Sequence, residues 1–117
     1  MQFTIPGPPQ VKQRPRFARG RAFTPKATEE YEKFVAQMAY AAVKQFEWSP
    51  LPGATFHLDV EIYRAAKRGD LTNFLKSIED GMNGIVFRDD KDVRQITAVM
   101  HDDKANPRAV VRVTELS

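Results

Sequence analysis

The 117-residue sequence has no cysteine and only two histidines, His57 and His101. Disulfides and thiolate metal sites are therefore excluded, and a zinc site built mainly on imidazoles is disfavoured. Any metal ion should instead be held by oxygen ligands, which favours magnesium or manganese. The absence of cysteine also favours a reducing, cytoplasmic location.

Long apolar runs are missing too, so we expect no membrane-spanning segment, and the N-terminus lacks a signal-peptide pattern. The length allows one domain with one hydrophobic core. A hydrophobic content of 42% with 28% charged residues is typical of a globular protein.

The net charge of +3 conceals an uneven distribution of charge along the chain. Residues 79–103 contain seven acids, whereas residues 12–26, named the basic arm below, contain six cations and no acid. Such a separation allows a protein to bind a polyanion with one segment and a cation with another. The cations of the basic arm are Lys12, Arg14, Arg16, Arg19, Arg21 and Lys26.

Two segments have the residue spacing of amphipathic helices. Thr24-Pro25 predicts the start of the first, with Thr24 as N-cap, and the apolar spacing extends to about Phe46. The second follows Asp70, and its apolar stripe consists of Leu71, Phe74, Leu75, Ile78 and Met82.

Four segments read as strands: residues 1–5, 56–63, 93–100 and 109–115. Residues 56–63 alternate strictly between apolar and polar side chains, which is typical of a half-buried strand. The last two strands are expected to be joined by a hairpin turn over residues 102–107, and the basic arm is expected to be a loop. These elements predict a single α+β domain in which a small mixed sheet of about four strands packs with two main helices.

The residues that could perform chemistry lie between Gly69 and Val93. Asp70 and Lys76 share the face of the second helix opposite its apolar stripe, and Asp89-Asp90 follows after a short apolar run. Two carboxylates brought together can hold a divalent cation, and Lys76 can stabilise a transition state or protonate a leaving oxygen. This combination suits phosphodiester cleavage.

Each of these residues also has a simpler interpretation. Asp70 alone is most simply an N-cap, Lys76 a solvated lysine, and Asp89-Asp90 part of a polar turn. The basic arm either binds phosphates, with Phe17 or Phe23 stacking on unpaired bases, or is a solvated loop. In the second case Phe23 is a hydrophobic anchor for the first helix.

Three segments resemble the RusA family of Holliday junction resolvases. They are IPGPP (5–9) with KQRPR (12–16) and FTP (23–25), then DLTNFLK (70–76), and finally EDGMNG (79–84) followed by Asp89-Asp90. Together they span most of the chain in the family's order, so residues 1–117 are expected to form one RusA-like endonuclease domain.

The resemblance implies a homodimeric, phage-related and magnesium-dependent endodeoxyribonuclease that resolves four-way DNA junctions in recombination or repair. Manganese could replace magnesium, and no nucleotide cofactor is implied. By position, Asp70 and Asp90 are implied to be metal-binding catalytic carboxylates and Lys76 the catalytic lysine. The expected DNA-binding residues are Lys12, Arg14, Arg16, Arg19, Arg21, Lys67 and Arg68.

The sequence departs from the family pattern at Thr72, where well-known members have a third catalytic aspartate. The neutral hydroxyl removes one charge from the expected metal site. Candidates to replace that charge are Asp80, Asp89, Asp59 and Glu61. The alternatives are therefore a catalytically weakened module that binds branched DNA, or a nuclease that acts on other branched DNA.

Overall fold

The structure, a computed structural model, describes residues 1–116. Its elements confirm the predicted α+β class, with two helices, a mixed four-stranded sheet and a two-stranded hairpin. In chain order they are β1 (Gln2–Pro6), β2 (Arg16–Ala18), β3 (Arg21–Phe23), α1 (Lys26–Gln45), β4 (Thr55–Arg64), α2 (Leu71–Met82), the short 3-10 helix η1 (Asp90–Asp92), β5 (Val93–Asp102) and β6 (Arg108–Leu116).

The main sheet has the strand order β1-β6-β4-β5, so β4 lies between the last two strands. The predicted hairpin between these two strands is therefore wrong, since β5 pairs with β4 in parallel and β6 pairs with β4 antiparallel. The helix α2 carries the chain back along the sheet, so β5 starts at the same end as β4. The following connection crosses the end of β4, where the Asp103 N–H donates to the Arg64 carbonyl at 3.0 Å.

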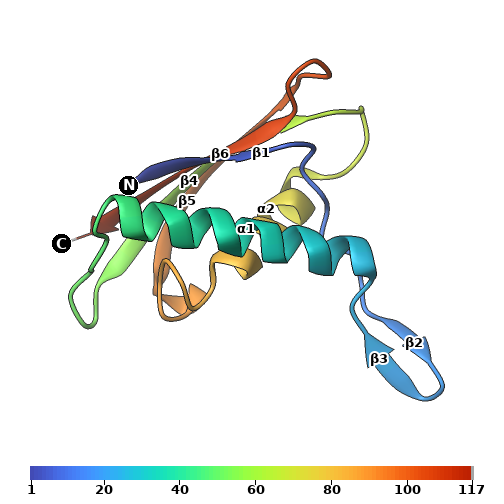
Figure 1. Ribbon diagram of the computed structural model, residues 1–117, viewed down its shortest axis with the longest axis horizontal. Coiled ribbons are helices and arrows are strands. Elements are labelled where there is room, and N and C mark those ends of the chain that lie inside the picture. Colours follow the sequence, from blue (N-terminus) through green and yellow to red (C-terminus); the bar gives the residue numbers. More distant parts are fainter. Residues whose placement is uncertain (117) are drawn as a thin grey trace.

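The hydrophobic core lies between one face of the sheet and the two helices (Figure 1). The predicted alternation in β4 is confirmed, because the side chains of Phe56, Leu58, Val60 and Ile62 are buried there. The opposite face of β4 carries polar side chains and is not covered by a helix in the described chain. Any chemistry on α2 therefore occurs on the helix side of the sheet.

The helix α1 begins one residue later than predicted, because Pro25 rather than Thr24 precedes its first turn. The backbone angles of Pro25 (φ −54°, ψ 142°) suit a cap position, and its carbonyl accepts from the Glu29 N–H at 3.1 Å. No capping bond from a side chain is present at this end of α1. Within residues 1–116, no helix combines the length and the apolar character that crossing a membrane requires.

The central part of the basic arm is not the predicted loop but the hairpin β2–β3, which extends away from the body (Figure 1). Arg19 (φ 54°) and Gly20 (φ 73°) form its turn. Positive φ at both central residues gives the turn the twist that two-residue hairpins require. The side chain of Phe17 is therefore held on a short strand opposite Ala22.

Candidate active site

One face of α2 carries the polar residues of the site. Thr72, Lys76 and Asp80 follow one another at intervals of four residues, so they lie along the same side of the helix. Phe74, Ile78 and Met82 are buried on the other side, which confirms the predicted separation of the two faces. Burial of this stripe in the core fixes which side chains of α2 face outward.

Asp70 immediately precedes α2, and its backbone caps the helix. The Asp70 carbonyl accepts from the Asn73 and Phe74 N–H groups, both at 3.1 Å. Its carboxylate makes no hydrogen bond to the cap and no ion pair within residues 1–116, and the residue is exposed. The side chain of Asp70 is thus available at the positive end of the helix, where negative charge is favoured.

The loop that leads to Asp70 is held in place by close packing around Gly69 and by the side chain of Arg64. Gly69 has a φ of +97°, and a Cβ added there would lie 2.7 Å from the Phe74 ring and 2.9 Å from a methyl group of Val11. The Arg64 guanidinium donates to the Gly69 carbonyl at 3.1 Å and pairs with Asp102. The loop therefore packs tightly, and it presents the exposed cations Lys67 and Arg68 just before Asp70.

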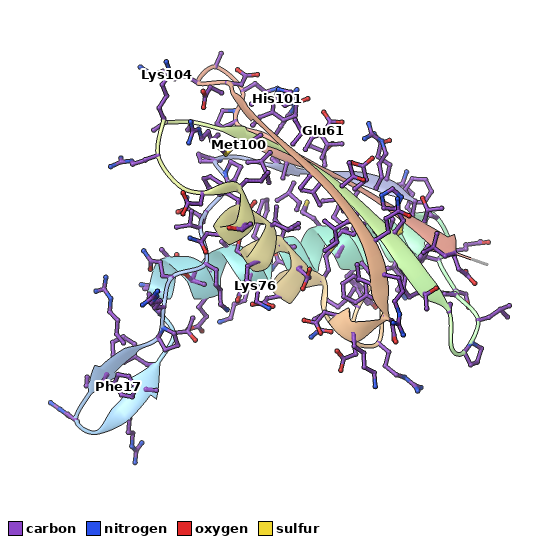
Figure 2. The ribbon with its side chains drawn as sticks, turned by 180° about the vertical axis from the view of Figure 1, so that it is seen from behind. Phe17, Glu61, Lys76, Met100, His101 and Lys104 are labelled. Carbon is purple, nitrogen blue, oxygen red and sulfur yellow. The ribbon has the colours of Figure 1, made fainter. Side chains whose placement is uncertain are left out.

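Lys76 lies between two carboxylates. Its ammonium is 3.2 Å from Asp80 Oδ1 and 3.9 Å from Asp90 Oδ2. The hydrogen bond to Asp80 raises the pKa of Lys76 above its ordinary value, although partial burial opposes that rise. Figure 2 shows Lys76 projecting from α2, on the helix side of the sheet. The structure thus brings Lys76 and Asp90 together from separate segments.

Glu79 is a neighbour of Asp90 that the sequence did not single out. Burial raises the pKa of Glu79, and the nearby carboxylates of Asp90 and Asp80 raise it further, while Lys76 lowers it. The interval of three residues from Lys76 to Glu79 is the signal that could have found it, since such pairs are neighbours on a helix.

Two of the candidates to replace the charge missing at Thr72 are turned away from α2. Asp59 and Glu61 lie on the opposite face of β4, where Arg112 Nη1 lies 3.7 Å and 3.0 Å from their carboxylate oxygens. Figure 2 shows Glu61 and Lys76 on different sides of the sheet. Alternation along β4 therefore keeps both acids away from Lys76.

The other two candidates, Asp89 and Asp80, already have partners of their own. The Asp89 carboxylate accepts from the Lys91 N–H at 3.1 Å, and this bond lowers the pKa of Asp89. It thus caps η1, as the polar-turn interpretation predicts. Asp80 lies directly beside Lys76, but its two oxygens are each paired with a lysine.

Within residues 1–116, no three carboxylates or imidazoles are grouped closely enough to hold a metal ion. The donors near Lys76 are nevertheless carboxylate oxygens, the ligand type that magnesium and manganese prefer. Magnesium is commonly bound by one or two carboxylates, with water and phosphate oxygens in its other positions. Asp90 supplies such an oxygen beside Lys76, whereas Asp70 stands at the start of α2 and makes no ion pair with Lys76 and no hydrogen bond to Asp90 in the described chain.

The cations of the basic arm fall into two groups. Its four arginines are exposed, and none makes an ion pair within the part of the chain that the structure describes. Phe17, between them, is 79% exposed, whereas Phe23 is 46% exposed. The two lysines form the other group, because Lys12 is paired with Glu32 and Asp80, and Lys26 is paired with Glu30 on α1.

The sequence matches a known protein family. A family model described as Endodeoxyribonuclease RusA matches residues 6–114. This range includes the basic arm, α2 and the acids that flank it. No curated protein matches the chain.

Proposed function

Because the chain belongs to the RusA family of endodeoxyribonucleases, we propose that it is a magnesium-dependent endonuclease that resolves four-way DNA junctions in recombination or repair. The main support from the structure is the polar face of α2, where Lys76 and Asp90 lie 3.9 Å apart. An exposed carboxylate without a partner in the described chain, that of Asp70, stands at the start of the same helix.

Asp70 and Asp90 would hold the metal ion, with water and a DNA phosphate completing its ligands. When bound, the ion supplies neutralisation of the phosphate and activation of a water molecule. The Lys76 ammonium adds positive charge where negative charge develops on the phosphate. The raised pKa of Lys76 favours this role over proton transfer, which works best when the pKa lies near the working pH.

DNA binding is assigned to the exposed cations. Arg14, Arg16, Arg19 and Arg21 have no acidic partner in the described chain, so their charges are available to phosphates. Lys67 and Arg68 are exposed just before Asp70, where they can hold the strand to be cut. An open cleft of about 360 Å³ adjoins this loop and is lined in part by Arg68, Gly69 and Phe74.

The proposal includes a homodimer. A four-way junction offers two equivalent strands, and a two-fold symmetric dimer presents one active site to each. Paired cuts at symmetric positions follow from this geometry. Sedimentation equilibrium at micromolar concentration tests the association directly.

A second candidate is a module that binds branched DNA without cutting it. It is favoured by Thr72, which is neutral, and by the lack of a three-acid group within residues 1–116. A third is a nuclease whose main substrates are flapped or otherwise branched DNA. Both alternatives keep the basic arm as a phosphate-binding segment.

A cleavage assay on an end-labelled four-way junction, with magnesium or manganese, separates these functions. The wild type should cut two opposing strands, whereas Asp70→Asn and Asp90→Asn should lose about 100-fold in rate or more. Both variants should keep their junction affinity or bind more tightly, because a negative charge near the phosphate is lost. Asp59→Asn, the same change on the opposite face of the sheet, is the matched control and should cut as the wild type does.

The outcomes of this assay are distinct. A wild type that binds the junction without nicking it, together with an Asp70→Asn variant that behaves identically, would establish the binding module. Faster cutting of flaps than of four-way junctions would establish the third candidate. Retained turnover in Asp90→Asn would contradict the role assigned to that carboxylate.

A further inference from the structure

Lys12 is the one cation of the predicted DNA-binding set whose ammonium pairs with acids in the described chain. Its Nζ lies 2.6 Å from Glu32 Oε1 on α1 and 3.1 Å from Asp80 Oδ2 on α2. Its side chain is 28% exposed, so part of its hydration has been replaced by these carboxylates. A DNA phosphate would have to compete with two negative charges that are already in contact.

Asp80 connects Lys12 to the active site. While Asp80 Oδ2 contacts Lys12, Asp80 Oδ1 contacts Lys76 at 3.2 Å, and Lys76 in turn lies 3.9 Å from Asp90. Five charges of alternating sign therefore run without interruption from α1 to the proposed metal ligand. Their order is Glu32, Lys12, Asp80, Lys76 and Asp90.

The backbone around Lys12 is anchored independently of its side chain. The Lys12 N–H donates to the Asn73 carbonyl at 2.9 Å, and the Ser77 hydroxyl donates to the Gln10 carbonyl at 2.6 Å. The Gln13 N–H donates to the Thr28 hydroxyl at 3.2 Å. Replacing the Lys12 side chain therefore leaves the base of the arm attached to both helices.

We infer that Lys12 is a positioning residue of the active site rather than a phosphate contact. By occupying one oxygen of Asp80, Lys12 fixes the carboxylate so that its other oxygen orients the Lys76 ammonium. Without Lys12, Asp80 can turn both oxygens toward Lys76 and draw the ammonium away from the phosphate. Glu32 would also add an uncompensated negative charge nearby. The inference rests on the proposed nuclease function.

The test compares binding with cleavage for Lys12→Met. Junction affinity is measured with EDTA present, so that the DNA stays intact, and cleavage is measured in a single turnover at saturating enzyme. We expect the cleavage rate to fall about tenfold, because small misplacements of catalytic groups cost one to two orders of magnitude. The Kd for the junction and its salt dependence should stay within twofold of the wild type.

Three further variants give the test its controls. Lys33→Met removes another lysine of α1 that pairs with an acid, Glu29 at 3.1 Å, and should match the wild type in both assays. Lys12→Arg keeps the charge and should recover at least half of the rate. Asp80→Asn breaks the same connection while leaving both lysines, so it should reproduce the slow cleavage and the unchanged affinity even if Lys12→Met fails to fold.

Several results would overturn the inference. Weaker binding and a smaller salt slope in Lys12→Met, with normal cleavage at saturation, would make Lys12 a phosphate contact. Wild-type behaviour of both Lys12→Met and Asp80→Asn, or a Lys12→Arg rate as low as that of Lys12→Met, would remove the positioning role. Each of these results leaves the nuclease function intact, whereas absence of cleavage by the wild type would refute that function and the inference together.

Discussion

Replacing Gly81 with alanine should force α1 and α2 apart and destabilise the protein by about 1–2 kcal/mol. Gly81 is buried in α2, and a Cβ added there would lie 2.7 Å from Val35 Cβ and 3.0 Å from the Glu32 carbonyl on α1. Carbon atoms in contact are normally about 3.5–4.0 Å apart. The added methyl group is therefore about 1 Å too close to Val35 Cβ and a few tenths of an ångström too close to the Glu32 carbonyl oxygen, and neither atom can rotate away.

The expected loss of stability in Gly81→Ala combines two opposing effects. Overpacking of a filled core typically costs about 1–3 kcal/mol. Alanine has a higher helix propensity than glycine, which returns up to about 1 kcal/mol. The clash should also disturb the candidate active site, because it moves α1 relative to α2. Lys12 pairs with Glu32 on α1 and, at 3.1 Å, with Asp80 on α2.

Urea unfolding followed by the fluorescence of Trp48 is the direct assay. The chain has a single tryptophan, whose indole N–H donates to the Val86 carbonyl at 2.8 Å and whose ring packs against Phe56 at 6.0 Å between centroids. Its emission therefore reports loss of the core. Protein concentration must be equal for all variants, because association makes apparent stability concentration-dependent.

A double-mutant cycle with Val35→Ala identifies the cause. Val35→Ala removes Val35 Cγ1, which would lie 2.8 Å from the new Cβ, but keeps Val35 Cβ, so it relieves part of the clash at the cost of a cavity of its own. The double variant should therefore be less destabilised than the sum of the single variants, by about 0.5 kcal/mol or more. A Gly81→Ala protein as stable as the wild type, or a cycle that is strictly additive, would refute the packing argument.

The remaining predictions concern the arm and the core. Replacing Arg14 and Arg16 with alanine should weaken binding to duplex and junction alike, and it should reduce the slope of log K against log salt concentration by about 2. Filter-binding titrations measure this slope. An unchanged slope would show that these side chains do not contact phosphates. Phe17→Ala should lower the preference for junctions over duplex at least a few-fold more than Phe23→Ala does, because stacking of one base on an aromatic ring contributes about 1–3 kcal/mol. Competition between labelled junction and unlabelled duplex measures this preference. Equal effects of the two variants would contradict a specific role for Phe17, the more exposed ring. Tyr31→Phe removes a buried hydroxyl that has no hydrogen-bond partner in the described chain. Thermal unfolding should therefore show unchanged stability or a gain of up to about 1 kcal/mol. A loss of more than about 1 kcal/mol would reveal that the hydroxyl has a partner.

Local sequence patterns predicted those features that depend on a few neighbouring residues. The alternation in residues 56–63 predicted β4 and its buried face, and the apolar stripe after Asp70 predicted α2. In both cases the spacing of side chains along the chain is itself the geometry of the element. Composition also predicted that the arginines of the basic arm are free of local ion pairs, because a segment without acids contains no carboxylate to pair with them.

The turn of the arm and the order of the strands were decided by tertiary structure. Positive φ at Arg19 and Gly20 made a hairpin where composition suggested a loop. The path of α2 along the sheet placed β5 beside β4, although β5 and β6 are adjacent in sequence. Strand order depends on contacts between distant segments, which local spacing does not record.

The pattern of residues along the chain was enough to identify the family, the two helices, the central strand, and Asp70, Lys76 and Asp90 as candidate site residues. Only the tertiary structure separated Asp59 and Glu61 from the site, brought Glu79 close to Asp90, and placed Lys12 between acids of two helices. The reason is that a charge acquires its role from the charges a few ångströms away. For these residues, those neighbours come from other helices and strands.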